Sequence, residues 1–307
     1  MTASRFAIGP DAPFSLAAAA SFGFGPDTGR PKPDGDLMRL AFVVDGYREH
    51  AGVVLRQQGD TILASVEGAR GAVVERQVLR VLSLDRPARD WLAVGTRDSV
   101  IGRLQREHPG LRPVLFHSPY EAAAWSVISA RKPRAYASAL RSNLAAAHGR
   151  IFELAGEELA AFPLPEKLAA LRAFPGLDTT RMTRLRAIAR AALDGLLDAS
   201  RLVALSPETA RAELETLPGI GPFYADLVLV RGTGLADLLP RNEPMLLSYV
   251  GHFYGKGGAV DMATLETIAE RWKPFRTWAT VLIRVAGDRA GLPVEQRGPR
   301  RGARSQP

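Results

Sequence analysis

The stretch that decides the fold is LETLPGIGPFYA, from Leu214 to Ala225. We expect one helix to end at Leu217 and the next to begin at Pro222, because proline is well suited to the first position of a helix. Between them, Gly219 and Gly221 allow backbone conformations that a side chain forbids, and they let an anion approach the main-chain amides. The second helix directs its first N–H groups and the positive end of its dipole to the same place. The stretch therefore predicts two helices joined by an anion-binding hairpin.

The rest of the chain has two different patterns. Beyond residue 90 we expect only helices, in the ranges 97–107, 119–129, 134–148, 165–173, 179–197, 207–217, 222–231, 244–254, 262–271 and 275–290. Before residue 85, β-rich runs predict antiparallel strands at 37–44, 52–56 and 61–66. Apolar residues at helical spacing predict a covering helix at 69–84, and the Gly- and Pro-rich stretch 23–35 predicts a loop.

Composition limits the class of protein. Of the 307 residues, 46% are hydrophobic and 23% are charged, which is typical of a globular protein. The net charge is +8, and +5 of it remains when residues 295–307 are set aside. This sign suits a polyanionic partner such as nucleic acid, although a solvated basic surface accounts for it equally well.

Two absences in the sequence narrow the chemistry and the location. The chain has no cysteine, which excludes disulfides and iron–sulfur clusters held by thiolates. No apolar run approaches the ~20 residues that a membrane span needs, and the N-terminus lacks the pattern of a secretion signal. We therefore expect a cytoplasmic protein that does not enter a membrane.

The hairpin and a second segment resemble a known family. LPGIG followed by an aromatic and a small residue resembles the helix-hairpin-helix of DNA-binding proteins; the alternative is a plain helix–helix connection with a glycine cap. Residues 271–279, RWKPFRTWA, resemble a signature of the 3-methyladenine DNA glycosylase II family. Residues 108–112 and 119–148 are similar to that family's first core helices, and the N-terminal sheet resembles the extra domain of its bacterial members.

The resemblance implies a mostly α fold. We expect an N-terminal α+β domain with an antiparallel sheet at 1–86, and a helical glycosylase-like core of two subdomains at 87–294. The helix-hairpin-helix occupies 206–231 of that core, and residues 295–307 form a disordered basic tail.

The resemblance also implies an activity, that of a monofunctional DNA repair glycosylase in base excision repair. Such an enzyme flips a damaged, here alkylated, base out of the duplex and hydrolyses its N-glycosidic bond. The family's catalytic residue is an aspartate at the start of the helix after the hairpin, and Glu243 holds that place here. A carboxylate there would stabilise the positive charge that develops on the sugar. The alternative is that Glu243 is only an acid at a helix start, favoured by the helix dipole.

Further site residues are implied in two groups. The DNA-binding residues would be Leu217, Gly219, Gly221, Pro222, Phe223, Arg131 and Lys132. The base pocket would be lined by Trp125, Tyr224, Trp278 and Arg284. For each of these three aromatic residues, a place in the hydrophobic core is the favoured alternative, because helical bundles bury such side chains.

The sequence departs from the family at three places. Glu243 is one methylene longer than the expected aspartate, and a shift on the order of 1 Å can cost about a hundredfold in rate. Ala130 and Arg131 stand where the family has a glutamine and the apolar wedge that enters the DNA, so Arg131 and Lys132 are alternatively a solvated loop that contacts phosphate. Arg284 stands where bacterial members have a tryptophan, and its guanidinium would repel a cationic alkylated base.

The implied partner is double-stranded DNA, bound by a monomer. The chemistry needs no metal or organic cofactor, although family members hold a monovalent cation at the hairpin carbonyls. The hairpin has no lysine for a Schiff base, which argues against lyase activity. Two alternatives stay open: a degenerate family member that binds bent or damaged DNA without excising a base, and a structural adaptor with no nucleic-acid role.

Overall fold

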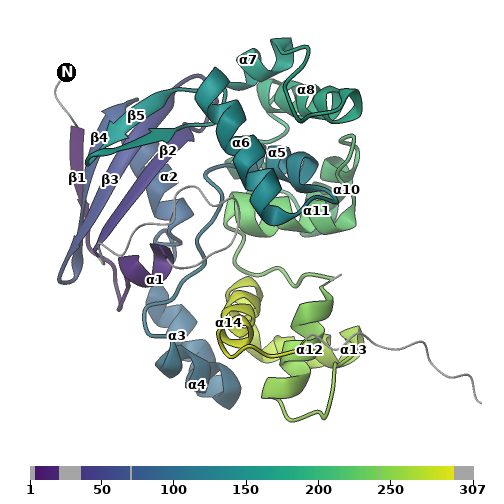
Figure 1. Ribbon diagram of the computed structural model, residues 1–307. Helices are drawn as coiled ribbons and strands as arrows, with labels where there is room; N and C mark the ends of the chain where they lie inside the picture. The colour runs from purple at the N-terminus through teal and green to yellow at the C-terminus, as the bar shows by residue number, and fades with distance from the viewer. Residues whose placement is uncertain (1–3, 21–35, 70, 242, 294–307) are drawn as a thin grey trace, which may run out of the picture.

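The computed structural model describes residues 4–20, 36–69, 71–241 and 243–293. The predicted loop at 23–35 and the predicted tail at 295–307 lie outside the described residues. A β-sheet forms one side of the molecule, and two groups of helices lie beside it, one above the other in the view of Figure 1.

The N-terminal sheet has four antiparallel strands in the order β1-β4-β3-β2. They are β1 (Ser4–Ile8), β2 (Leu37–Val43), β3 (His50–Gln58) and β4 (Thr61–Gly68). The prediction of β2, β3 and β4 is confirmed, and the turn between β3 and β4 contains Gly59, which has a positive φ of 59°. The edge strand β1 is an addition that the sequence reasoning missed.

Both faces of the sheet are covered. On one face lie α1 (Leu16–Ala20) and the predicted helix α2 (Ala72–Val81), which buries Val74 and Val78 against the strands. A hairpin of β5 (Ile151–Leu154) and β6 (Glu157–Ala160) contacts β2 and β3.

The expectation that only helices follow residue 90 is therefore wrong. Phe152 and Leu154 alternate with exposed residues, and Phe152 packs so close to Gly52 that a Cβ atom there would lie 2.7 Å from its ring. The two-residue turn of this hairpin, Ala155 and Gly156, has positive φ at both positions, as a type I′ hairpin requires.

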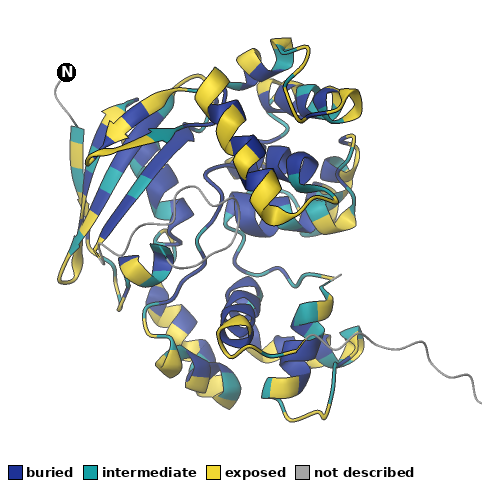
Figure 2. Cartoon of the chain, viewed as in Figure 1, coloured by how far each residue is buried: buried dark blue, intermediate teal, exposed yellow. Residues whose placement is uncertain are grey.

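The upper helices form one hydrophobic core around α5 (Pro119–Ser129), which is buried along nearly all of its length (Figure 2). The other helices of this group are α6 (Arg134–His148), α7 (Pro165–Ala170), α8 (Thr179–Leu193), α9 (Ala199–Ala204), α10 (Pro207–Glu215) and α11 (Pro222–Val228). A π-helical turn, η1 (Leu229–Thr233), continues α11. Of these helices, α9 was not predicted.

The lower helices join two distant parts of the chain. They are α3 (Ala88–Arg97), α4 (Ser99–Glu107), α12 (Pro244–Phe253), α13 (Met262–Ala269), a short 3₁₀ turn η2 (Glu270–Trp272) and α14 (Arg276–Arg289). Trp91 of α3 packs against Phe275, the residue before α14, and against Trp278 of α14, and these residues belong to one buried cluster. The predicted helix at 97–107 corresponds to α4, and α3 was not predicted.

Helix starts follow the local chemistry of the sequence. Proline is the first residue of α5, α7, α10, α11 and α12, where its missing N–H costs no hydrogen bond. Side chains of Asp98, Ser118, Asp178, Ser206 and Asp261 accept hydrogen bonds from first-turn N–H groups of their helices. This is why the starts of these helices were predicted closely.

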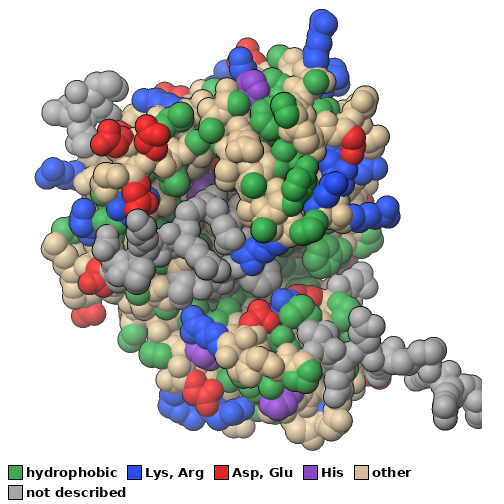
Figure 3. All heavy atoms as spheres, viewed as in Figure 1, with side chains coloured by type: hydrophobic (Ala, Val, Ile, Leu, Met, Phe, Trp, Pro, Cys, Tyr) green, Lys and Arg blue, Asp and Glu red, His purple; other side chains and the backbone are tan. Residues whose placement is uncertain are grey.

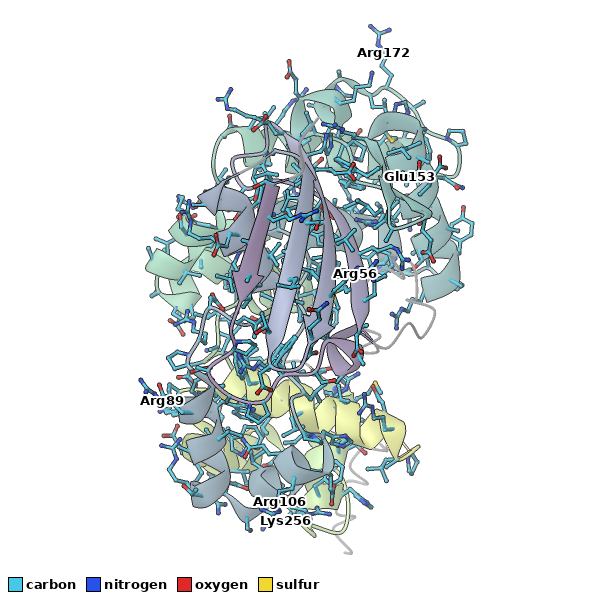
Figure 4. The ribbon with its side chains drawn as sticks, turned by 90° about the vertical axis from the view of Figure 1, so that its left-hand side faces the viewer. Arg56, Arg89, Arg106, Glu153, Arg172 and Lys256 are labelled. Carbon is cyan, nitrogen blue, oxygen red and sulfur yellow. The ribbon has the colours of Figure 1, made fainter. Side chains whose placement is uncertain are left out.

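Labelled basic side chains lie toward both ends of the molecule. In Figure 4, Arg172 projects from one end, while Arg89, Arg106 and Lys256 lie toward the other. The positive net charge therefore does not locate a functional site. The site is located by the side chains around the hairpin.

Candidate active site

The predicted hairpin joins α10 to α11 as expected. Gly219 has a φ of +93°, a conformation that only glycine adopts without strain. Ile220 is buried, and its N–H donates to the Leu217 carbonyl over 3.0 Å, which closes the turn. Gly221 caps α11 at its start, and a Cβ atom there would contact no other atom, so the surface beside it is open.

The chain between the hairpin and Glu243 is held from both sides. The Arg80 guanidinium of α2 donates to the Gly232 carbonyl over 2.9 Å. On α14, the Thr277 hydroxyl donates to the Leu235 carbonyl over 2.8 Å and accepts from the Leu238 N–H over 3.0 Å. Contacts from the N-terminal part and from α14 thus fix the segment that leads to Glu243.

A pocket of about 80 Å³ lies between the upper and the lower helices. This is several times the ~10–15 Å³ that one water molecule needs. Figure 3 shows hydrophobic side chains on both sides of the hollow between the two groups of helices. The residues that line the pocket are Phe223, Asp226, Leu227, Val230, Arg231, Pro240, Glu243, Thr280, Val281, Arg284 and Val285. The pocket therefore begins directly at the hairpin, through Phe223.

Glu243 and Arg284 form an ion pair inside this pocket. Glu243 is the residue before Pro244 at the start of α12, and Arg284 comes from the buried α14. The Glu243 side chain is 20% exposed, so it faces the pocket and not bulk solvent. Burial lowers the pKa of the Arg284 guanidinium, while Asp288 opposes this effect.

Two further charged groups of the pocket were missed from the sequence. Asp226 on α11 is buried and pairs with Arg211 over 2.7 Å. Arg231 on η1 is buried beside Phe116, and burial, with the nearby charge of Arg134, lowers its pKa to about 9. Asp226 lies three residues after Phe223, which is the one signal that places it on the same side of α11.

The predicted site residues divide into two sets. Phe223, Glu243 and Arg284 meet in the pocket, and the Phe223 side chain is 51% exposed. The predicted pocket residues Trp125, Tyr224 and Trp278 are not among those that line it.

Packing explains why those three aromatic side chains lie elsewhere. Trp125 is buried in the core of the upper helices, and Tyr224 packs against the same core. Trp278 is buried edge-on against Trp91 and Phe275, with ring centroids 5.7 and 5.0 Å away. Their place in the hydrophobic core is the alternative that the sequence left open.

The predicted wedge lies on an exposed loop between α5 and α6. Arg131 has a φ of +56°, which is uncommon for a residue with a side chain, and Lys132 lies over the Tyr136 ring at 5.3 Å. The Ala130 carbonyl of this loop accepts a hydrogen bond from Arg181 over 2.8 Å. Both cationic side chains are exposed to solvent.

The described residues include no group of three or more His, Asp or Glu side chains that could hold a metal ion. No helix in the described parts of the chain is long and apolar enough to cross a bilayer.

Known proteins of similar fold indicate the class of protein. No family model matches the chain. Its fold, mostly helical and preceded by a four-stranded antiparallel sheet, matches that of a solved DNA glycosylase, so the predicted fold class is confirmed. The structure is similar to a 3-methyladenine DNA glycosylase from Archaeoglobus fulgidus, with a TM-score of 0.73 and 22% identity over 92% of this chain and 98% of that one. It is also similar to an 8-oxoguanine glycosylase/lyase of Clostridium acetobutylicum in complex with double-stranded DNA, with a TM-score of 0.65 and 14% identity over 95% of this chain and 99% of that one.

By sequence, the chain is similar to 3-methyladenine DNA glycosylases. It is 29% identical over 191 residues to DNA-3-methyladenine glycosylase 2 of Escherichia coli. The match covers 61% of this chain and 64% of that protein, which is less than two thirds of its length.

Proposed function

We propose that this chain is a monofunctional DNA glycosylase that releases a damaged base from duplex DNA. The observation that supports this most is the position of Glu243, whose carboxylate shares a pocket with Phe223 at the start of the hairpin helix. A DNA strand held at the hairpin would bring a flipped nucleotide to this pocket, because a base inside the duplex is out of reach. The relatives named above act on alkylated or oxidised bases, and one of them was determined with bound duplex.

The chemistry assigned to Glu243 is electrostatic. Breaking the N-glycosidic bond develops positive charge on the sugar, and a carboxylate beside it lowers the energy of that transition state. The same carboxylate can orient the attacking water. Arg284 pairs with this carboxylate and orients it in the pocket.

We propose an alkylated base as the substrate, as in the curated relative. A panel of duplexes tests this: each contains one lesion, either a cationic N-alkylated purine or an uncharged damaged base, and release of free base is measured by chromatography. Release from any lesion duplex but not from undamaged DNA supports the glycosylase. Duplex binding with no release from the whole panel contradicts it.

A second function is favoured by the same ion pair. Because Arg284 already engages the Glu243 carboxylate, the pair could serve only to join the start of α12 to α14. The chain would then bind bent or damaged DNA without excising a base. This is the outcome in which the lesion panel gives tight binding and no free base.

Gly221 offers a direct test of the hairpin. A Cβ atom at Gly221 would have no atom beyond its chain neighbours within 4 Å, so we expect Gly221→Val to change the free energy of unfolding by less than about 1 kcal/mol. The new side chain would cover the surface beside the amides, and we expect binding to duplexes of any sequence to weaken about tenfold, since amides contact phosphate only. Fluorescence anisotropy with two unrelated duplexes measures this. Unchanged affinity would remove the DNA-binding role from the hairpin.

A monovalent cation held by main-chain carbonyl oxygens of residues 217–221 is part of the same proposal, since carbonyl oxygens are suitable ligands for a hard cation. We propose no metal or organic cofactor for the bond cleavage itself.

A further inference from the structure

Arg184 on α8 lies across the tip of the hairpin, although the two are 35 positions apart in sequence. A Cβ atom at Gly219 would lie 2.8 Å from Cδ and 3.2 Å from Nε of Arg184. The guanidinium group therefore lies beside the same main-chain turn that we propose as a phosphate site.

Arg184 differs from the arginines near it in its ion pairing. Nearby arginines are paired: Arg181 with Asp178, Arg201 with Glu213, and Arg211 with Asp226. In the described part of the chain, Arg184 forms no such ion pair. An arginine with five N–H donors and no acid partner is suited to hold the oxygens of a phosphodiester.

The same helix joins the hairpin to the loop between α5 and α6. Arg181 lies three residues before Arg184, so the two side chains leave neighbouring positions on one face of α8. Arg181 donates to the Ala130 carbonyl, which fixes the loop that presents Arg131 and Lys132. Figure 3 shows Lys and Arg side chains gathered on the right-hand edge of the upper helices.

We propose that Arg184 is a DNA-backbone contact that makes one continuous surface of the α5–α6 loop, the face of α8 and the hairpin tip. Its partner is the phosphodiester strand of a duplex, because cations without acid partners and exposed amides select repeated negative charge rather than base edges. This inference rests on the proposed DNA-binding function and adds to it a contact from a helix outside the hairpin.

The test is the salt dependence of binding to an undamaged duplex. Each phosphate contact contributes about 0.9 to the slope of log affinity against log salt. We expect Arg184→Gln to lower the magnitude of this slope by about 0.9 and to weaken binding by about threefold to tenfold at low salt. Arg184→Lys keeps the charge and should restore most of the slope.

The matched control is Arg172→Gln, because Arg172 projects from the end of the molecule in Figure 4 and is exposed. Its slope should equal that of the wild type. If Arg172→Gln and Arg184→Gln lower the slope equally, the effect is general electrostatics and the assignment to Arg184 is overturned. If the wild type itself fails to bind duplex DNA, the proposed function fails as well. Circular dichroism melting of each variant establishes that the fold is intact.

Discussion

Glutamine in place of Glu243 is expected to lower the rate of base release by about 10²- to 10⁴-fold while duplex binding stays close to wild type. The carboxylate would stabilise charge that exists only in the transition state, so its loss should lower kcat rather than raise KM. The substitution keeps the shape of the side chain and its place before Pro244. Single-turnover release of free base from the best duplex of the lesion panel measures the effect.

Two variants make this result specific. Glu243→Asp restores the charge but shortens the side chain, and we expect partial activity, because a displacement on the order of 1 Å costs about a hundredfold. Asp226→Asn removes the other carboxylate of the pocket, which Arg211 already binds over 2.7 Å. It should affect stability more than the rate of release.

The opposite pattern would change the assignment. Equal release by the wild type and Glu243→Gln would show that the carboxylate has no chemical role. A larger loss of rate in Asp226→Asn than in Glu243→Gln, at equal stability, would transfer that role to Asp226.

Local signals explain what the sequence could predict of the fold. Both α5 and α11 begin with proline, α5 after the capping side chain of Ser118 and α11 after Gly221, and their starts were predicted to the residue. The β5–β6 hairpin was missed because only four residues form each strand and its stability depends on Phe152 packing at Gly52, far away in sequence. Short strands of this kind depend on tertiary contacts more than on their own propensity.

The candidate site was predicted only in part, because it too depends on tertiary contacts. Glu243 and Arg284 were located by their positions relative to the hairpin and to the segment at 271–279, and they do meet. The contact between these two side chains could not be predicted, because it depends on how α12 and α14 are placed in the folded protein. Trp125 and Trp278 lie on helices that are buried on all sides. In such a helix, the hydrophobic periodicity does not distinguish a residue that lines a pocket from a residue in the core.

The largest effect on stability is expected at Glu121, a buried carboxylate of α5. It accepts from Arg141 over 2.6 Å and lies 3.2 Å from the His117 ring nitrogen Nδ1, and its other oxygen accepts from the Val43 N–H of β2. Glu121→Gln would leave the buried Arg141 guanidinium without its partner charge. Removing one member of a buried pair costs about 3–5 kcal/mol, and we expect a loss of this size in the free energy of unfolding by urea.

The pH dependence of the stability difference shows whether the charge of Glu121 causes the loss. Burial alone would raise the pKa of Glu121, but His117 and Arg141 outweigh it and lower the pKa from its ordinary value of 4.5 to about 2. Because the folded pKa lies below the unfolded one, the stabilisation is complete above about pH 5 and is lost as the pH falls toward 2. The difference in stability between wild type and Glu121→Gln should therefore shrink by about 3 kcal/mol over that range.

Glu213→Gln is the matched control, because Glu213 forms an exposed ion pair with Arg201, and such pairs contribute about 0–1 kcal/mol. Taking the difference between wild type and variant at each pH cancels the titration of all other acids. A constant difference between pH 5 and pH 2 would show that the ionised form of Glu121 does not stabilise the junction of the sheet with α5 and α6. If the difference in stability disappears as Glu121 becomes protonated, this buried pair holds the N-terminal sheet against the helices that carry the hairpin.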